Sequence, residues 1–210
     1  MKKKIGYLHV LTDTELQSQF SHLELAQLAI DGGADTIQFR QKSGSTREMI
    51  EIARKLKGMC AEAGVTFIVN DRVDVAIASE ADGVHLGQDD FPIALARKLM
   101  GEDVIIGGSA VSLEDAQRCF AEGADYVGFG PVYPTSSKPD ASFPTGIELM
   151  KKAIKTVPLP VIAIGGIHAQ NAPEVMRAGA YGIAVISAVC CQADPKKATR
   201  MLSQALRMSK

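Results

Sequence analysis

Two consecutive stretches of the chain decide its fold: residues 66–72, TFIVNDR, and residues 83–90, GVHLGQDD. Each begins as a short apolar run, which is typical of a buried strand, and each ends in polar and acidic residues. If the two strands are parallel neighbours, Asp71 and Asp90 emerge at the same edge of one sheet. Two carboxylates that converge there could bind Mg²⁺, but an aspartate in such a place often only caps the following helix, and for each residue taken alone both interpretations stay open.

The same unit, a short β-branched run followed by a longer amphipathic segment, recurs about eight times along the chain. Strands are expected at about residues 5–11, 36–40, 66–71, 83–87, 104–107, 126–130, 160–166 and 182–187. Helices are expected at about residues 21–30, 46–63, 73–79, 92–100, 113–121, 146–155, 173–178 and 194–208. Apolar strands separated by helices indicate a parallel sheet covered on both faces. Eight such units favour the α/β class, as a closed (β/α)₈ TIM barrel, over an open doubly wound sheet. We therefore predict one catalytic barrel domain over residues 1–210.

Composition limits the function classes. A net charge of -1 gives no electrostatic reason to expect nucleic acid or an anionic membrane surface as a partner. No stretch approaches the roughly 18 apolar residues that a membrane span needs, and the apolar run after the basic start is too short for a signal peptide. A cytoplasmic protein is therefore expected. The four cysteines lack C-x-x-C spacing, so neither a zinc site nor a disulfide framework is indicated.

The carboxyl ends of the expected strands carry functional groups in a barrel, and here those ends are polar. Gln38, Arg40 and Lys42 alternate along the end of the second strand, so we expect all three to point toward the barrel mouth. Such groups on a buried strand would be costly without an anionic partner, which favours a binding site over a solvated surface pair.

A second candidate site lies at the other end of the chain. Gly165-Gly166 follows the seventh strand and Ile186-Ser187 the eighth, which resembles the backbone phosphate site of many barrels. The long loop 131–144 after the sixth strand could bind an anion and close over a substrate, although it also looks like an ordinary solvated loop. Its candidate residues are Thr135, Ser136, Ser137 and Lys138.

The histidines do not suggest a catalytic triad. His9 and His85 fall inside strands, where hydrogen-bonded structural roles are expected, and no Ser/His/Asp arrangement or histidine metal cluster emerges. The remaining features are a hard cation held by two aspartates, a basic strand end and a separate phosphate site. Together they predict two phosphorylated substrates, one of them a magnesium-bound diphosphate.

With these motifs in order, the chain resembles the thiamine phosphate synthase family over nearly its whole length, from residue 7 to residue 188. The glycine-rich motifs alone would indicate only a phosphate-binding barrel, whereas the full set in this order is specific. The motifs are QFRQK at 38–42, NDRVD at 70–74, GVHLGQDD at 83–90, GFGPVYPT at 128–135 and IGGI at 164–167.

The resemblance implies a transferase that joins 4-amino-2-methyl-5-(diphosphooxymethyl)pyrimidine to a thiazole phosphate and releases diphosphate. It implies a dissociative mechanism in which diphosphate leaves first and the thiazole nitrogen captures the resulting pyrimidine methyl cation. In family terms Asp71 and Asp90 would bind Mg²⁺. Asp74 and Asp89 lie close enough in sequence to substitute for either ligand, so that alternative stays open. The residues that would hold the pyrimidine diphosphate are Gln38, Phe39, Arg40, Gln41, Lys42, Asn70, Ser109 and Lys138, with Arg40, Lys42, Asn70, Ser109 and Lys138 in catalytic roles. Those that would hold the thiazole phosphate are Thr135, Ser136, Ser137, Gly166, Ile186 and Ser187.

Two other functions stay open at this level. The related thiazole tautomerase shares the barrel and the phosphate site but lacks the paired aspartates and relies on a histidine where this chain has Val111. A non-catalytic phosphate-binding barrel is a third reading, although ligand binding alone would not need both acidic motifs together with Arg40, Lys42 and Lys138. Whether the chain forms a homo-oligomer, and whether the thiazole carries a carboxylate, the sequence leaves open.

Overall fold

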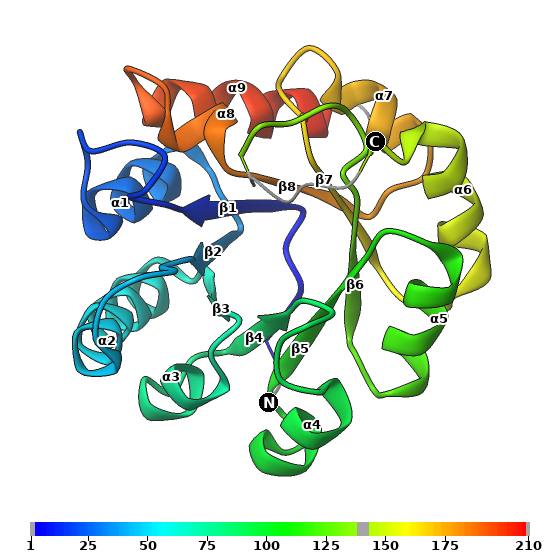
Figure 1. The fold of residues 1–210 in the computed structure, drawn as a ribbon. Helices are drawn as coiled ribbons and strands as arrows, with labels where there is room; N and C mark the ends of the chain where they lie inside the picture. The colour runs from blue at the N-terminus through cyan, green and yellow to red at the C-terminus, as the bar shows by residue number, and fades with distance from the viewer. Residues whose placement is uncertain (1–2, 138–142, 209–210) are drawn as a thin grey trace.

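The computed structural model describes residues 3–137 and 143–208, and its strands form a closed parallel barrel (Figure 1). The strands pair in sequence order, and the last closes on the first. This confirms the predicted TIM barrel. The strands are β1 (Leu8–Thr12), β2 (Thr36–Phe39), β3 (Thr66–Asn70), β4 (Gly83–Leu86), β5 (Ile105–Ala110), β6 (Tyr126–Phe129), β7 (Val161–Ile164) and β8 (Gly182–Val185).

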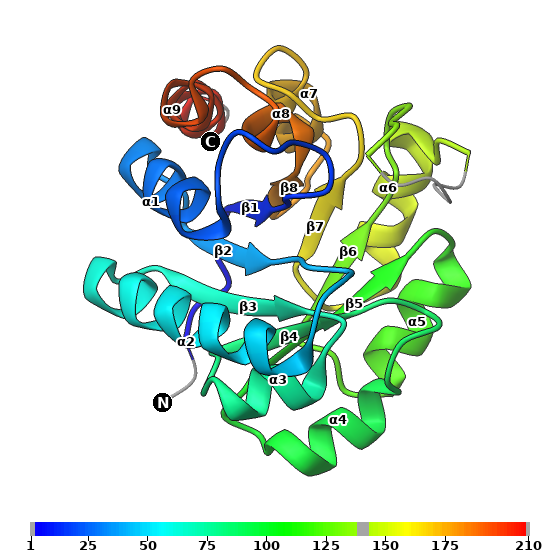
Figure 2. The same ribbon diagram turned by 60° about the vertical axis from the view of Figure 1, so that its left-hand side comes forward.

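Helices cover the outside of the barrel, as the view in Figure 2 shows. They are α1 (His22–Gly32), α2 (Thr46–Ala63), α3 (Val73–Ala78), α4 (Ile93–Met100), α5 (Leu113–Ala121), α6 (Gly146–Thr156), α7 (Ala172–Arg177), α8 (Ser187–Cys190) and α9 (Pro195–Arg207). The expected bounds hold within three residues at each element, and α8, which was not expected, follows the last strand. There β8 ends at Val185 and the four-residue α8 begins at Ser187, because one helical turn is too short to show an apolar period.

The two stretches that decide the fold lie side by side. β3 pairs in parallel with β4, with Val69 opposite Val84 and Asn70 opposite His85. The backbone N–H of Asp71 extends this pairing by donating to the carbonyl of His85 at 2.8 Å. The acidic residues that follow the two strands therefore emerge at one edge of the barrel, as predicted.

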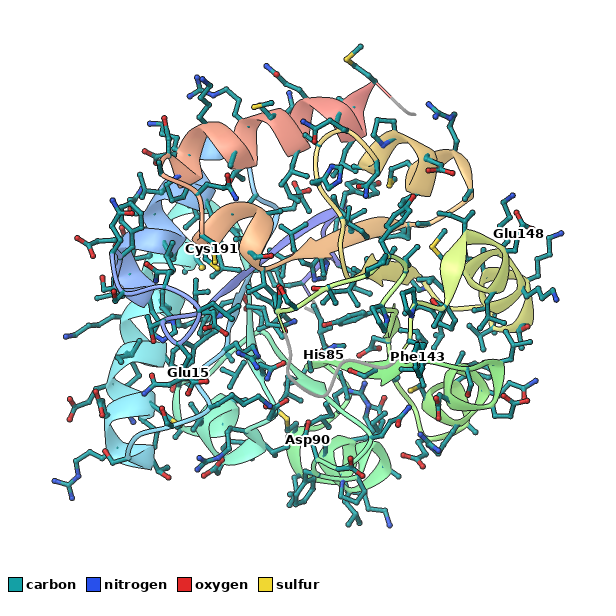
Figure 3. The ribbon with its side chains drawn as sticks, turned by 45° about the horizontal axis from the view of Figure 1, so that its top comes forward. Glu15, His85, Asp90, Phe143, Glu148 and Cys191 are labelled. Carbon is teal, nitrogen blue, oxygen red and sulfur yellow. The ribbon has the colours of Figure 1, made fainter. Side chains whose placement is uncertain are left out.

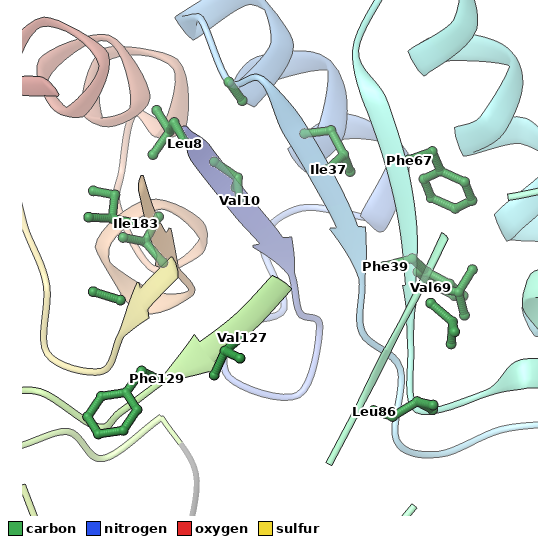
Figure 4. Close-up of a cluster of buried hydrophobic side chains, with 14 of the residues drawn as sticks. Leu8, Val10, Ile37, Phe39, Phe67, Val69, Leu86, Val127, Phe129 and Ile183 are labelled. Carbon is green, nitrogen blue, oxygen red and sulfur yellow. The ribbon is translucent and has the colours of Figure 1, made fainter. Parts of the chain in front are cut away.

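Successive side chains of a strand point to opposite faces of the sheet, so the strands contribute to two apolar clusters, one outside the barrel and one inside it. Outward-facing residues such as Val10, Ile37 and Phe67 pack under the helices and form the larger cluster (Figure 4). Inward-facing residues include Ile68 and Ile105, which pack in the smaller cluster.

Aromatic rings occupy part of the barrel interior and determine where glycine is needed. A Cβ added to Gly107 would lie 2.2 Å from Tyr126 Cζ, and one added to Gly128 would lie 2.8 Å from His85 Cε1. Only glycine therefore leaves room for these two rings, which stack with their centroids 5.4 Å apart.

Within residues 3–137 and 143–208, the helices are all too short or too polar to cross a membrane.

Candidate active site

A cavity of about 1020 Å³ opens at the carboxyl ends of the strands. Three residues locate it in Figure 3, where His85 lies between Asp90 and Cys191, and all three line the cavity. The cavity brings together most of the residues predicted from the sequence. These are Gln38, Lys42, Asn70, Asp71, Asp90, Ser109, Thr135, Ser136, Ser137, Gly166, Ile186 and Ser187.

Asp71 and Asp90 meet at the β3–β4 edge of this cavity. Lys42 Nζ donates to Asp71 Oδ2 at 2.5 Å, and the backbone N–H of Gly87 donates to Asp90 Oδ2 at 2.7 Å. Burial would raise the pKa of Asp71, but its hydrogen bond with Asp90 and its ion pair with Lys42 hold that pKa below the ordinary value. Burial and the neighbouring Asp71 raise the pKa of Asp90. The carboxylate of Asp71 thus opposes the ionisation of the neighbouring Asp90, an arrangement that a bound cation would relieve.

Helix capping, the other interpretation of these aspartates, is not what they do. The residues at the N-caps of α3 and α4 are Arg72 and Pro92, and neither makes a side-chain capping bond. By contrast, the Ser112 hydroxyl caps α5 by accepting from the N–H of Asp115 at 3.0 Å. Asp71 also has a positive φ of 64°, which is uncommon for a residue with a side chain and is tolerated best by Asp and Asn.

The donor set at this edge suits a hard cation that shares its ligands with a substrate. Among the described residues, no group of three or more His, Cys, Asp or Glu side chains is arranged to hold a metal ion. Mg²⁺ commonly uses only one or two protein carboxylates and completes its coordination with water and substrate phosphates. Asp71 and Asp90 fit that pattern. Asp74 does not line the cavity and pairs instead with Arg72, whereas Asp89 does line it.

The end of β2 differs from the expectation that Gln38, Arg40 and Lys42 all face the barrel mouth. Gln38 and Lys42 line the cavity, but Arg40 does not. Its guanidinium forms an ion pair with Asp13, and both residues are buried. The physical reason is that a buried charge needs a partner, and Asp13 after β1 supplies one. Arg40 Nε has no hydrogen-bond partner among the described residues.

Two other residues of the same motif also lie away from the cavity. The Phe39 side chain belongs to the outer apolar cluster, beneath the helices. Gln41 Nε2 donates to the carbonyl of Ser43 at 2.8 Å, within its own loop. The side chains of Phe39 and Gln41 are therefore placed for packing and loop structure.

The floor of the cavity carries a polar chain that sequence reasoning treated as structural. His85 Nδ1 lies 3.0 Å from the Tyr126 hydroxyl, and His85 Nε2 lies 3.0 Å from Ser109 Oγ. His85 is hydrogen-bonded, as expected, but it is only partly buried and lines the cavity. In the sequence, the role of His85 is indicated only indirectly, by the glycines on neighbouring strands. His85 pairs in register with Gly107, one of the two glycines that make room for the His85 and Tyr126 rings.

The β7–β8 side of the cavity is built mainly from backbone. Gly165 and Gly166 have φ values of 96° and 64°. A Cβ added to Gly166 would lie 2.5 Å from the carbonyl oxygen of Pro134, so the loop after β6 approaches this backbone closely. Ser137 Oγ donates to Ser187 Oγ at 2.9 Å, which joins that loop to the start of α8. Lys138, predicted for this loop, lies outside the described residues.

Val111 also lines the cavity, just beyond β5. Its side chain has no group that can transfer a proton. The residue on which the thiazole tautomerase would rely is thus replaced by an inert one at a position open to a substrate.

Comparison with known proteins gives consistent results. The sequence model of the family described as thiamine monophosphate synthase matches residues 8–189. A thiamine-phosphate synthase from Salinibacter ruber is 50% identical and covers 98% of this chain and 90% of its own length. One from Methanocella arvoryzae is 51% identical over 93% of this chain and 92% of its own. The solved structure of a thiamine phosphate pyrophosphorylase from Pyrococcus furiosus is 43% identical, with a TM-score of 0.88 over 97% of this chain and 96% of that one.

Proposed function

The chain belongs to the thiamine monophosphate synthase family, a family of transferases, and we propose that it couples a pyrimidine methyl diphosphate to a thiazole phosphate, giving thiamine phosphate and diphosphate. The observation that carries this reaction is the pairing of Asp71 with Asp90 at one edge of a cavity whose opposite side is a separate, backbone-based anion site. A single phosphorylated ligand would not need both sites.

The acidic edge would hold the diphosphate of the pyrimidine substrate through Mg²⁺. Asp71 and Asp90 are the two residues that would bind the ion, which when bound would supply positive charge to the leaving group. Lys42 already contacts Asp71 and lines the cavity beside it. When a cation shields the aspartates, the Lys42 ammonium is free to turn toward a phosphate oxygen. Asn70 lines the cavity next to this pair and offers an amide to the same group.

The floor and the opposite side would position the two organic rings. Gln38 and Ser109 face the interior, where they can hydrogen-bond a pyrimidine whose methylene carbon points to the mouth. Gly166, Ser137 and Ser187 would bind the phosphate of the thiazole through N–H and hydroxyl donors. Arg40, which does not line the cavity, would contribute indirectly by holding the β1–α1 loop through its ion pair with Asp13.

Such a site favours a dissociative substitution. The cavity presents charge and hydrogen-bond donors to a leaving diphosphate and places a second ring beside the departing bond, so the residues stabilise developing charge and orient a partner. Ser109 Oγ lies 3.0 Å from His85 Nε2 at the cavity floor, but a dissociative substitution needs no enzymic nucleophile, so this pair would serve to position the pyrimidine.

A coupling assay tests the proposal. The purified protein is mixed with both substrates and Mg²⁺, and thiamine phosphate and diphosphate are measured by chromatography. We expect both products in equal amounts. Absence of product with the thiazole phosphate and also with its carboxylated form would overturn the synthase function.

A thiazole phosphate isomerisation assay serves as the comparison. With Val111 in place of a proton-transferring residue, we expect no conversion of the carboxythiazole tautomers by this chain. Rapid tautomer conversion without coupling would favour the tautomerase instead.

A further inference from the structure

Two adjacent cysteines stand at the end of α8, and the proposed reaction uses neither. The sulfur atoms of Cys190 and Cys191 lie 3.7 Å apart, and both thiols are free. Cys191, labelled in Figure 3, is exposed and lines the cavity, whereas Cys190 is 1% exposed and packs in the inner apolar cluster. One sulfur therefore faces solvent while the other lies in contact directly behind it.

The spacing of neighbouring residues disfavours a direct bond between these sulfurs. Consecutive Cα atoms are about 3.8 Å apart, which is shorter than the roughly 4.4–6.8 Å that unstrained disulfides require. An atom inserted between the sulfurs relaxes that requirement, because it lengthens the ring and removes the S–S torsion. The pair is thus better suited to bind a thiophilic atom than to form a disulfide.

We propose that Cys190 and Cys191 form a two-thiol binding site for trivalent arsenicals of the type R–As=O. Two As–S bonds form, the arsenic–oxygen bond is broken, and the oxygen leaves as water with the two thiol protons. No atom changes oxidation state, so no oxidant or reductant is needed. Arsenic, which accepts two sulfurs at one atom, meets the geometry that the adjacent residues impose.

The exposure of the two thiols sets the order of bond formation. Cys191 reacts first because its sulfur is open to the cavity. Burial raises the pKa of Cys190, so it is the poorer starting nucleophile. Once arsenic is attached to Cys191, however, the Cys190 sulfur is already in contact and the second step is intramolecular, which favours the closed chelate over attachment to a single thiol.

The other cysteines do not offer such a pair. Cys60 and Cys119 are both buried, and they lie on separate helices, α2 and α5. Burial raises the pKa of Cys60 to about 12 and that of Cys119 to about 11. When a competing monothiol is present in excess, we therefore expect a trivalent arsenical to stay bound only at the cysteine pair at the end of α8.

The site is placed to obstruct the cavity. Ser187 begins the helix that ends at the cysteine pair, and Gln192 Nε2 donates to the Ser187 carbonyl at 3.1 Å. An arsenical on Cys191 would project into the space that Ser187 and Gln192 also line. This consequence concerns the proposed phosphate side, but the thiol site itself does not rest on the proposed function.

The test is intact-protein mass spectrometry of the full chain after incubation with phenylarsine oxide and an excess of 2-mercaptoethanol. We expect one retained phenylarsenic group per chain, with loss of one water, and its complete release by dimercaptopropanol. Peptide mapping should place the group within residues 178–196, between two tryptic cleavage sites that enclose the pair. No substrate is present, so a failure of the synthase assay would leave this result unaffected.

Two variants and a matched control decide the assignment. Cys191→Ser changes an exposed residue and should abolish the retained group, as should Cys190→Ala. Cys119→Ser is the control: it keeps the pair, and its hydroxyl can replace the Cys119 thiol as donor to the Ser109 carbonyl, so it should retain the group fully. Absence of a retained group in the unaltered chain, or undiminished retention in Cys191→Ser, would overturn the proposal.

Discussion

The two sides of the cavity offer different means of binding the anions proposed for them. At the β2–β4 side these means are charged side chains, and Asp71 already contacts both Asp90 and Lys42. At the β6–β8 side they are glycine backbone and hydroxyls, with Gly166 in the left-handed region and Ser137 bonded to Ser187. The first arrangement has its own charges to neutralise, so we expect it to depend on a cation. The second is close to neutral and depends on shape. On the proposed function, this difference would direct a metal-bound diphosphate to one side of the cavity and a simple phosphate to the other.

The largest expected effect is on the charged side. Asp71→Asn and Asp90→Asn should each lower the coupling rate on the order of 10²–10³-fold, because each removes a charge that organises the leaving group. Asparagine is chosen since it tolerates the positive φ of Asp71. Steady-state rates at saturating Mg²⁺ give the measurement.

Asp74→Asn is the matched control for these variants. Asp74 is an exposed acid nearby whose partner is Arg72, and it does not line the cavity. Its rate should stay close to that of the unaltered chain. An equal loss in Asp74→Asn would show that general charge, and not the pair, matters.

On the backbone side, Gly166→Ala should raise the KM for the thiazole phosphate at least about tenfold and leave the KM for the pyrimidine diphosphate unchanged. The added Cβ would meet the Pro134 carbonyl, and a left-handed alanine costs roughly 1–2 kcal/mol of stability. Initial-rate kinetics and thermal unfolding separate the two effects.

Gly64→Ala is the control that shows the effect of backbone strain alone, at a glycine outside the cavity. Gly64 also has a positive φ, 71°, but an added Cβ there would meet no atom within 4 Å, and the residue only ends α2. This variant should lose similar stability with both KM values intact. If it raised the thiazole phosphate KM as Gly166→Ala does, strain and not the local approach would be responsible.

A smaller effect is expected for Ser187→Ala. The loss of one hydrogen bond to a charged group, about 1.5 kcal/mol, corresponds to roughly a tenfold rise in KM for the thiazole phosphate. Because Ser187 lies away from the acidic pair, the KM for the pyrimidine diphosphate is the internal control. A change confined to that second KM would reverse the assignment of the two sides.

The smallest effect is expected beneath both sides, at the cavity floor. Tyr126→Phe keeps the ring that Gly107 accommodates but removes the hydroxyl next to His85 Nδ1. We expect a few-fold lower rate, on the scale of one neutral hydrogen bond. If Tyr126 acts through His85 on Ser109, Tyr126→Phe should have little effect on the coupling rate in a chain that already carries Ser109→Ala. Rate losses of the two substitutions that simply add in the double variant would contradict this coupling.

The barrel could be predicted because its rules are local. Each strand is a short apolar run, each helix has an apolar period, and parallel neighbours bring Asp71 and Asp90 to one edge whatever the details of packing. The same locality identified Gly166 and Ser187, which directly follow β7 and β8.

What could not be predicted depends on contacts between distant segments. Alternation predicted that Arg40 would face the mouth, but Asp13, which follows another strand, draws its guanidinium away. His85 looked structural because its neighbours Tyr126 and Ser109 come from β6 and β5. Helix α8 has a single turn, so β8 was expected to run two residues further.

The division of the cavity into two independent anion sites is tested most directly by calorimetric titration. Magnesium diphosphate and the thiazole phosphate are each titrated into the unaltered chain, Asp71→Asn and Gly166→Ala. We predict that Asp71→Asn loses affinity only for magnesium diphosphate and Gly166→Ala only for the thiazole phosphate. If either variant weakened both ligands to the same extent, the two-site account would be contradicted.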